Sequence, residues 1–454
     1  MQRRARLQRL TGRLVAAAVK GALSEGHCQV QPMGRCDTSE LGLPSPPMRD
    51  VRTGAVAWSV AVLVLASSCT ASNPCNATNC SGDAGDSGAS WVRQFGQIGP
   101  DTASAVALDS QSNVYVVGST AGRQLSGHNQ ALQDDVFLRK YDSSGTEQWV
   151  RLFGEPDLDE EATGVAVDAA GNVLVLGTLE TARRSDVFLR KYDPAGNVLW
   201  SQETGSPSGD LTVGLAVDAA GNAYVAGYTY GALPGQTHVG DSDLFLMKFD
   251  PGGGAVWTRQ FGTPAADRAK GISIDPAGNV VVLGWTLGVF PGHTPPGPAY
   301  AFVRQYDSSG GVLWTRQLPR NAGAIAAGEA SSLIVMGHGY VENHDANGNV
   351  VWSGTFAGDG VSAISAGSGN VLVAVDARAT PDGQTVLMYD SSGTQVSSWM
   401  IGLPSPTDFV TGIAVNQLGR LFACGSTVGV FPGETWIGLS DAFVMRTHLR
   451  APVP

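Results

Sequence analysis

Residues 163–200 read Thr163-Gly-Val-Ala-Val-Asp168, Ala-Ala-Gly-Asn172, Val-Leu-Val-Leu-Gly177, a variable stretch, Asp186-Val-Phe-Leu-Arg-Lys-Tyr-Asp193, Pro-Ala-Gly-Asn197 and Val-Leu-Trp200. Four short apolar runs alternate here with turn-forming residues. Asp at the start of a turn accepts hydrogen bonds from the backbone two residues on, and Gly supplies the positive φ of a bulged hairpin turn. The stretch therefore predicts four antiparallel strands, which we call a, b, c and d in chain order.

The same unit recurs along the chain, and a tryptophan marks its fourth strand. Trp91, Trp149, Trp200, Trp257, Trp314, Trp352 and Trp399 stand 58, 51, 57, 57, 38 and 47 residues apart. A repeat of this size is typical of the blades of a β-propeller. The chain is therefore predicted to be all-β, with four-stranded antiparallel blades arranged in a ring.

The two ends of the repeat region complement each other. The last unit stops after its third strand, Asp441-Ala-Phe-Val-Met-Arg446, whereas Trp91-Val-Arg-Gln-Phe95 stands alone before the first unit and resembles a fourth strand. Pairing of these segments closes the ring and leaves only short, protected strand edges. We expect a seven-bladed β-propeller over residues 91–448, closed by the N-terminal strand and followed by a tail at 449–454.

The recurrent tryptophan is interpreted as architectural. A large ring at the outer edge of a blade buries on the order of 200 Å2 against the neighbouring blade. The composition agrees, since 59 of 454 residues are Gly and only 15% are charged, as suits an all-β protein dense in turns. Units five and six keep only altered first turns, near Gly328 and Gly367, so thin or irregular blades are expected there.

The seventh unit carries Gly412-Ile-Ala-Val-Asn416, Gly419-Arg-Leu-Phe-Ala-Cys-Gly425, Phe431-Pro-Gly433 and Gly438-Leu-Ser-Asp441-Ala-Phe-Val444. This pattern resembles the bacterial SBBP repeats, a family of seven-bladed propellers, over almost all of residues 91–446. The resemblance implies an extracytoplasmic propeller. It implies no single activity and transfers no catalytic residue.

Residues 48–68 have the three parts of a secretion signal: Met48-Arg-Asp-Val-Arg52, an apolar run from Ala55 to Ala66, and small residues before Cys69. The apolar run is too short to span a bilayer comfortably. Ala66-Ser67-Ser68-Cys69 resembles a bacterial lipobox, in which cleavage precedes the cysteine and lipid is attached to it. We expect a lipoprotein anchored at Cys69, the alternative being an ordinary cleaved signal peptide. Thr70 favours the outer membrane or the cell surface.

Residues 1–47 precede this signal and contain six Arg or Lys residues between Arg3 and Lys20, set among Leu and Val. They are readable as a transit peptide or a membrane-surface helix. We favour translation from Met48, in which case residues 1–47 are not part of the mature protein.

Residues 69–90 are rich in Ser, Asn, Asp and Gly and are interpreted as a flexible tether behind the lipidated cysteine. Cys75 and Cys80 lie in this segment, where they either form a disulfide in an oxidising compartment or remain free thiols. Cys424 falls in a second strand, where a buried, inert thiol is expected.

The formal net charge is −11, and the acidic excess follows the basic N-terminal segment. An acidic surface repels phosphate backbones, so a nucleic-acid partner is not expected. Cationic or neutral partners fit better. We expect a monomer that reaches the membrane through its lipid anchor alone.

Acidic residues recur where strand a begins, while the fifth unit has Arg320 there; the acids are Asp101, Glu160, Asp210, Asp267, Asp359 and Asp408. Strand a lines the channel of a propeller, so these carboxylates lie near one mouth of it. The favoured interpretation is that each caps its own turn by accepting backbone hydrogen bonds. The alternative is a ring that binds a ligand or Ca2+ through oxygen atoms; no other cofactor is expected.

The loops between strands b and c lie at the same end and are long and dissimilar in four units; they contain His128, His238, Trp285, His293 and Trp436. Variable loops on a rigid scaffold commonly carry recognition, and exposed aromatic side chains suit a peptide or a sugar ring. Phe290 and Phe431 lie in these loops but are interpreted as cover for their own blades. A metal site of the three histidines is disfavoured because they belong to different blades.

Catalytic signatures such as Gly-x-Ser-x-Gly, His-Glu-x-x-His and Cys-x-x-Cys are absent from the sequence. We therefore predict a lipid-anchored binding module of the bacterial envelope, not an enzyme, which binds a protein, peptide or glycan through its loop-rich face. The alternatives are a polysaccharide hydrolase or lyase that uses the acidic channel mouth, and a structural subunit of an envelope complex.

Overall fold

The computed structural model describes residues 90–121, 134–154, 158–181, 184–293, 300–328, 331–356, 360–367, 370–376, 384–405, 407–416 and 418–447. All belong to the second of two compact units, Val56–Pro454, the first being Met1–Ala55. The expected signal sequence, the lipid attachment at Cys69, the pair Cys75 and Cys80, and the site candidates His128 and Asp359 lie outside the described residues. No helix in the described ranges has the length and apolar character needed to cross a membrane.

The described residues form four-stranded antiparallel sheets, seven in number, and six of these consist of consecutive strands. The six are β2 (Asp101–Leu108), β3 (Val114–Ala121), β4 (Asp134–Tyr141) and β5 (Glu147–Phe153); β6 (Asp159–Val167), β7 (Val173–Glu180), β8 (Ser185–Tyr192) and β9 (Val198–Thr204); β10 (Asp210–Val217), β11 (Ala223–Thr229), β12 (Asp243–Phe249) and β13 (Ala255–Phe261); β14 (Asp267–Ile274), β15 (Val280–Thr286), β16 (Tyr300–Tyr306) and β17 (Val312–Gln317); β18 (Ala322–Ala327), β19 (Leu333–Gly337), β20 (Tyr340–His344) and β21 (Val350–Thr355); and β22 (Gly360–Gly367), β23 (Asn370–Asp376), β24 (Gln384–Tyr389) and β25 (Gln395–Ile401).

The remaining sheet, which we call the composite blade, joins both ends of the described chain in the order β1-β28-β27-β26. Its strands are β1 (Trp91–Phe95), β26 (Phe409–Val415), β27 (Leu421–Thr427) and β28 (Asp441–Thr447). β1 lies antiparallel to β28, with Trp91 opposite Arg446 and Phe95 opposite Ala442. Six described blades are therefore each made by one continuous stretch of chain, and not the expected seven. The last repeat supplies only three strands of its sheet, and β1 supplies the fourth.

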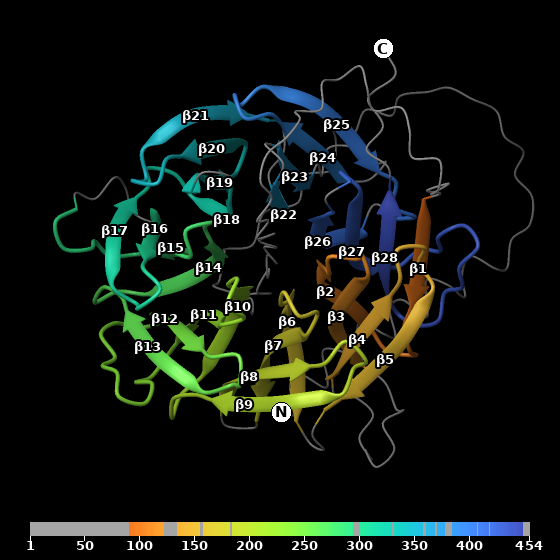
Figure 1. Cartoon of the computed structure of the whole chain (residues 1–454), viewed down its shortest axis with the longest axis horizontal. Helices are drawn as coiled ribbons and strands as arrows, with labels where there is room; N and C mark the ends of the chain where they lie inside the picture. Colours follow the sequence, from red (N-terminus) through yellow and green to blue (C-terminus); the bar gives the residue numbers. More distant parts are fainter. Residues whose placement is uncertain are drawn as a thin grey trace, which may run out of the picture. The chain divides into compact units, whose positions relative to one another are not determined.

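Strand a of each sheet, which in the composite blade is β26, lines a central axis, and the sheets are arranged around this axis (Figure 1). These strands contact one another in the order β2, β6, β10, β14, β18, β22 and β26, and β26 contacts β2. Apolar side chains fill the space between neighbouring sheets; Tyr224 of β11, for example, packs in one cluster with Ile272 of β14. The chain is an all-β propeller, as predicted from its repeats.

The Asp-Gly turns form as the sequence indicates. Asp168 Oδ1 accepts hydrogen bonds from the backbone of Ala170 and Asn172, both at 2.9 Å. Gly171 has a φ of 83°, in the left-handed region that glycine adopts without a steric penalty. These short hairpins bring strands a and b together at one end of the blade, which leaves the longer b–c loops at the other end.

Blades five and six, β18–β21 and β22–β25, have all four strands, contrary to the expectation that they are thin or irregular. Their shorter repeats are accommodated by shorter connections: β19 and β20 are separated only by residues 338 and 339. The deletions therefore shorten loops and some strands, and each sheet keeps its four strands.

Candidate functional site

The recurrent tryptophans join neighbouring blades at their outer edges. Six of them, in the described chain, donate a hydrogen bond from Nε1 to a carbonyl in the c–d turn of the next blade at 2.9 to 3.3 Å. The pairs are Trp91 with Ser143, Trp149 with Pro194, Trp200 with Pro251, Trp257 with Ser308, Trp314 with Ala346 and Trp352 with Ser391. The architectural interpretation of these residues is confirmed.

A glutamine and an aspartate hold each of two long b–c loops in place. In the composite blade, Gln94 Nε2 donates to Gly429 O at 2.9 Å and to Asp441 Oδ2 at 2.8 Å, and Gln94 Oε1 accepts from Phe431 N at 3.0 Å. Gln260 makes the same three contacts with the loop of the β10–β13 blade. The backbone of a loop held in this way is ordered before binding, which lowers the entropy lost on binding.

The phenylalanines of these loops cover their own blades, as predicted. Phe290 is 3% exposed and packs edge-on against Phe302, and Phe431 is 4% exposed and packs against Phe443. Neither offers a ring face to a ligand.

The described aspartates at the start of strand a each bond to their own turn. The contacts are Asp101 Oδ2 with Gln97 N at 2.7 Å, Asp210 Oδ2 with Ser206 N at 2.5 Å, Asp267 Oδ2 with Thr263 N at 2.6 Å, and Asp408 Oδ2 with Ser405 N at 2.9 Å. Glu160 is buried at the equivalent position, and Arg320 is exposed, with its guanidinium 5.2 Å from the ring of Tyr340.

Burial dominates the electrostatics of these carboxyl groups. It raises the pKa of Asp101 to about 6, against hydrogen bonds from Thr120 and Gln97 that lower it, and it also raises the pKa of Asp210 and Asp267. Among the described residues no three His, Cys, Asp or Glu side chains are placed to hold a metal ion. The contacts are those of turn caps, and Ca2+ binding stays a prediction.

The remaining described loop residues lie on three blades, with Trp285 and His293 on the same one. His238 and Trp285 are both partly buried, on the β11–β12 loop and on β15 respectively, and His293 is partly buried on the loop after β15. Trp436, on the β27–β28 loop, is 50% exposed. Of the predicted site residues that the structure describes, Trp436 is therefore the one that most clearly offers an aromatic ring to solvent.

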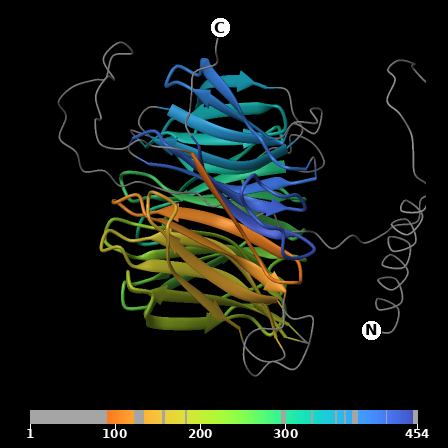
Figure 2. The same ribbon diagram turned by 90° about the vertical axis from the view of Figure 1, so that its right-hand side faces the viewer.

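Trp436 belongs to an exposed apolar surface where the ring closes. We define this surface, the closure patch, as Ile98, Trp436, Ile437 and Leu439, which are 82%, 50%, 49% and 71% exposed. Residues 97–100 and the β27–β28 loop lie side by side (Figure 2), joined by a hydrogen bond from Asp101 N to Ser440 O at 2.9 Å. A Cβ on Gly438 would stand 2.1 Å from Gln97 O, so this close approach requires glycine.

Only Trp436 of this patch was singled out from the sequence. Ile98, Ile437 and Leu439 are isolated apolar residues in loops, a pattern that occurs equally in buried segments. A comparison of equivalent loops would have identified the patch. The composite blade has Trp436, Ile437 and Leu439 where the β10–β13 blade has His238, Val239 and Asp241.

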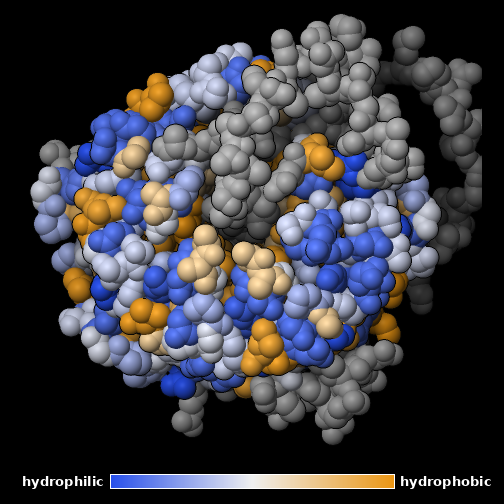
Figure 3. Space-filling model, in the orientation of Figure 1, coloured by the Kyte–Doolittle hydropathy of each residue, from blue (hydrophilic) through white to orange (hydrophobic). Residues whose placement is uncertain are grey.

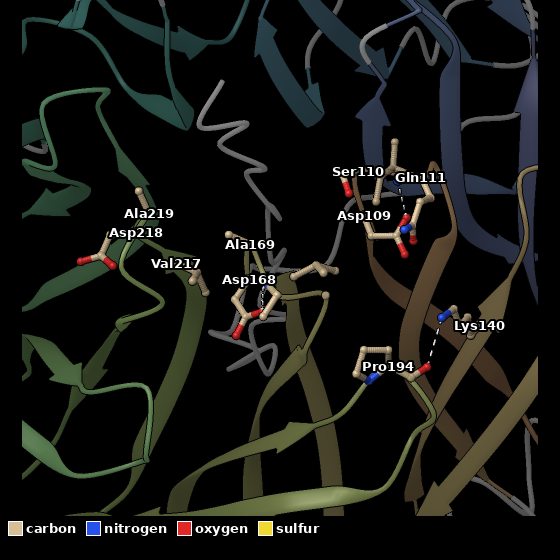
Figure 4. A pocket seen from close by; sticks show the side chains of 14 residues that line it. Asp109, Ser110, Gln111, Lys140, Asp168, Ala169, Pro194, Val217, Asp218 and Ala219 are labelled. Carbon is tan, nitrogen blue, oxygen red and sulfur yellow. Dashed lines mark hydrogen bonds between the residues drawn. The ribbon is translucent and has the colours of Figure 1, made fainter. Parts of the chain in front are cut away.

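A cavity of about 380 Å3 lies at the opposite end, between the a–b turns of the first three blades (Figure 4). Its polar lining includes Asp109, Asp168, Asp218 and Lys140. Asp109 and Asp218 accept two backbone hydrogen bonds each within their turns, and Lys140 Nζ donates to Pro194 O at 3.1 Å. Its polar groups are therefore engaged in holding the turns.

On the face drawn in Figure 3, hydrophobic residues are scattered among hydrophilic ones. The clustering of four exposed apolar side chains on two adjoining loops makes the closure patch the better candidate for a binding surface.

Comparison with known proteins supports the repeat assignment. A model of the SBBP family, described as a beta-propeller repeat, matches residues 90–123, 199–234 and 256–291. Each matched stretch runs from a fourth strand through the first two strands of the next blade, or, for the first match, from β1 into β2 and β3. The resemblance to SBBP repeats is confirmed over these stretches.

The chain is also similar to the regulatory protein FlaEY of Caulobacter vibrioides, with 25% identity over 359 residues, which cover 70% of this chain and 35% of the relative. It thus spans about a third of that protein's length.

Solved structures with a similar fold include BamB from Moraxella catarrhalis, at 13% identity, with 78% of this chain and 85% of the other covered and a TM-score of 0.40. The WD40 domain of Neurospora crassa Pan2 shares 13% identity, with 78% and 90% covered and a TM-score of 0.46. The WD40 domain of Doa1 shares 12%, with 79% and 96% covered and a TM-score of 0.49. These likenesses concern fold and do not bear on function.

Proposed function

We propose that this chain is a non-enzymatic interaction module of the bacterial cell envelope that binds a protein partner through the closure patch. A β-propeller fold suggests protein interaction in general. We place the binding surface here on a single observation, which is the exposure of four apolar side chains on two adjoining loops: Ile98, Trp436, Ile437 and Leu439. Exposed apolar residues gathered on adjoining loops commonly mark an interface, and Trp is enriched among residues that dominate binding energy.

The attachment of the loops supports a preformed binding surface. Asp441 Oδ2 and Oδ1 accept hydrogen bonds from Ile437 N and Gly438 N, both at 3.0 Å, and Gln94 bonds to Asp441 from β1. The apolar side chains therefore project from a backbone that is already fixed, so a partner loses little of its binding energy to ordering them.

The direction of β1 supports display of the patch away from the expected anchor. Trp91 lies beside the c–d turn of the neighbouring blade, since its Nε1 donates to Ser143 O. Phe95, at the other end of β1, leads into the segment with Ile98. The described chain therefore begins at the end of the propeller opposite the closure patch.

Site-specific cross-linking tests the proposed surface. A photo-reactive amino acid at Leu439 is expected to capture a protein partner in cells, whereas one at Asp241, the equivalent position of the β10–β13 blade, is not. The captured partner is then purified and its binding to the isolated chain is measured. Equal capture from both positions would contradict the proposal.

A matched pair of substitutions gives the quantitative test. Ile437→Ser is expected to weaken binding of the purified partner about ten-fold, as expected for loss of a buried aliphatic contact. Val239→Ser is the control, because Val239 is 51% exposed and donates its backbone N–H to Asp243 as Ile437 does to Asp441. The proposal fails if both variants bind like the unmodified chain.

The envelope address is tested independently. Labelled fatty acid is expected to appear on the protein and to be lost in Cys69→Ser and after globomycin treatment. Labelling that persists in Cys69→Ser would show that the anchor is elsewhere, without affecting the binding proposal.

A further inference from the structure

Arg268 lies in an aromatic pocket at the loop-rich end of the propeller, at the start of β14. Its guanidinium carbon is 5.2 Å from the ring centre of Tyr228, 5.9 Å from that of Tyr230 and 5.5 Å from that of Trp285. Its Nη2 donates to the hydroxyl of Tyr230 at 3.0 Å. Two blades therefore build the pocket: β11 and the residue after it supply the tyrosines, and β15 supplies Trp285.

The guanidinium retains unused hydrogen-bonding capacity. Its Nε is buried and has no hydrogen-bond partner among the described residues, although an unpaired buried donor is costly. Arg268 also forms no ion pair within the described ranges, where Arg139 and Arg184, for example, pair with Glu147 and Asp186. Within the described residues, its guanidinium therefore has three aromatic rings and the Tyr230 hydroxyl as partners, and no carboxylate.

Lys270 adds a second positive charge two residues further along β14. It is the extra residue of a β-bulge, since the pairing of β14 with β15 shifts between Ala269 and Gly271. Bulges redirect side chains. The same shift recurs in strand a of the other described sheets, at Ser104, Thr163, Val213, Gly323, Ser362 and Thr411, so Lys270 is the one ionisable residue at the strand-a bulge of these sheets. Burial and the nearby Arg268 lower the pKa of Lys270.

We propose that Arg268 and Lys270 bind a carboxylate of an acidic peptide segment of the partner, with Tyr228, Tyr230 and Trp285 holding the guanidinium in place. This inference rests on the proposed function, because it states that the protein partner carries an acidic segment that contacts the same loop-rich end of the propeller. A carboxylate accepts two hydrogen bonds from one guanidinium edge. The edge formed by Nη1 and Nη2 is the one it would bind, because Nε is buried. The guanidinium already lies against the three rings, which favours a carboxylate at its free edge over a stacked sugar ring.

Another stacked arginine of the same blade supplies a matched control. Arg304 has its guanidinium 4.5 Å from the ring of Phe261 and 4.6 Å from that of Phe290, and its Nε donates to Thr315 Oγ1 at 2.8 Å. Its environment is aromatic like that of Arg268, but its Nε is satisfied.

Fluorescence anisotropy with a fluorescein-labelled hexaglutamate peptide and the full-length chain tests the inference. Binding is expected to weaken with salt, to fall about ten-fold in Arg268→Gln and to fall less in Lys270→Gln. Arg268→Lys, which keeps the charge but not the two-pronged geometry, is expected to recover only part of the loss. Arg304→Gln is expected to bind like the unmodified chain, and thermal unfolding checks that each variant is folded.

Three results would overturn the inference: no binding of hexaglutamate, equal binding by folded Arg268→Gln, or binding of inorganic phosphate or polygalacturonate in place of the peptide. None of these affects cross-linking from Leu439. Failure of this inference is therefore distinguishable from failure of the closure patch as a binding surface.

Discussion

The aspartates that begin strand a act as turn caps inside a poorly solvated environment. Asp101 is 1% exposed, yet it must accept the hydrogen bond from Gln97 N that holds the turn after β1. The sequence predicted this capping role, because an acid repeated at one position of six of the seven units suits a local contact. It could not show how deeply the carboxyl groups are buried, since that depends on the neighbouring blade.

The first prediction concerns the pH dependence of stability. Because burial raises the pKa of Asp101 from 3.8 in the unfolded chain to about 6 in the folded protein, the folded state binds the proton more tightly. The contribution of Asp101 to stability is therefore complete below about pH 4 and is lost as pH rises through 6, by at most about 3 kcal/mol. Asp101→Asn is expected to flatten this fall in urea unfolding measured from pH 4 to pH 7.

An exposed turn aspartate is the control for this prediction. Hydrogen bonds from Asn197 lower the pKa of Asp193. Its contribution is therefore present at neutral pH and lost as the solution is acidified, so Asp193→Asn should alter the profile only on the acid side. Identical pH profiles for the unmodified chain and Asp101→Asn would contradict the assignment.

The second prediction concerns the tryptophan contacts between blades. Trp200 Nε1 donates to Pro251 O at 3.0 Å, and the indole covers Gly253 in the same turn. Trp200→Phe keeps an aromatic ring but removes the donor, so the free energy of unfolding should fall by about 1 kcal/mol. Trp200→Ala also removes the packing and should cost about 3 to 5 kcal/mol. Urea unfolding measures both, and equal losses would show that only the hydrogen bond matters.

At the scale of elements, the strands and hairpin turns were largely predictable and the long loops were not. Short apolar runs and Asp-Gly turns are local signals. The loops are fixed by contacts distant in sequence, such as Gln94 with Gly429 and Phe431. The bulge of strand a also escaped prediction, because nothing in the sequence around Lys270 marks the extra residue.

The third prediction concerns the glutamine that anchors the loop of the β10–β13 blade. Gln260→Ala removes bonds to Leu233 N at 2.9 Å, Gly231 O at 2.9 Å and Asp243 Oδ2 at 2.8 Å. Amides of residues 231–240 should exchange with deuterium faster, with a global loss of about 2 to 4 kcal/mol. Glu203→Ala, at the same position of exposed β9, should leave exchange in this loop unchanged. Unaltered exchange in Gln260→Ala would show that the loop is held by other contacts.

At the scale of the molecule, ring closure was predictable because the last repeat lacks a fourth strand and the solitary first strand, Trp91–Phe95, resembles the fourth strand of the other repeats. The location of the candidate surface was not. Ile98 is 341 residues from Leu439, and only the pairing of β1 with β28 brings their segments together. The proposed function therefore depends on the composite blade.

An engineered disulfide between Val92 and Met445, which face each other across β1 and β28, tests this closure most directly. Val92→Cys with Met445→Cys in the full-length chain should form an intramolecular disulfide, mapped by mass spectrometry, and should raise the midpoint of thermal unfolding. The pair Val92→Cys with Phe443→Cys, which is out of register, should form it poorly. A disulfide that appears only between two molecules, or equally in both pairs, would contradict the composite blade and the binding surface built on it.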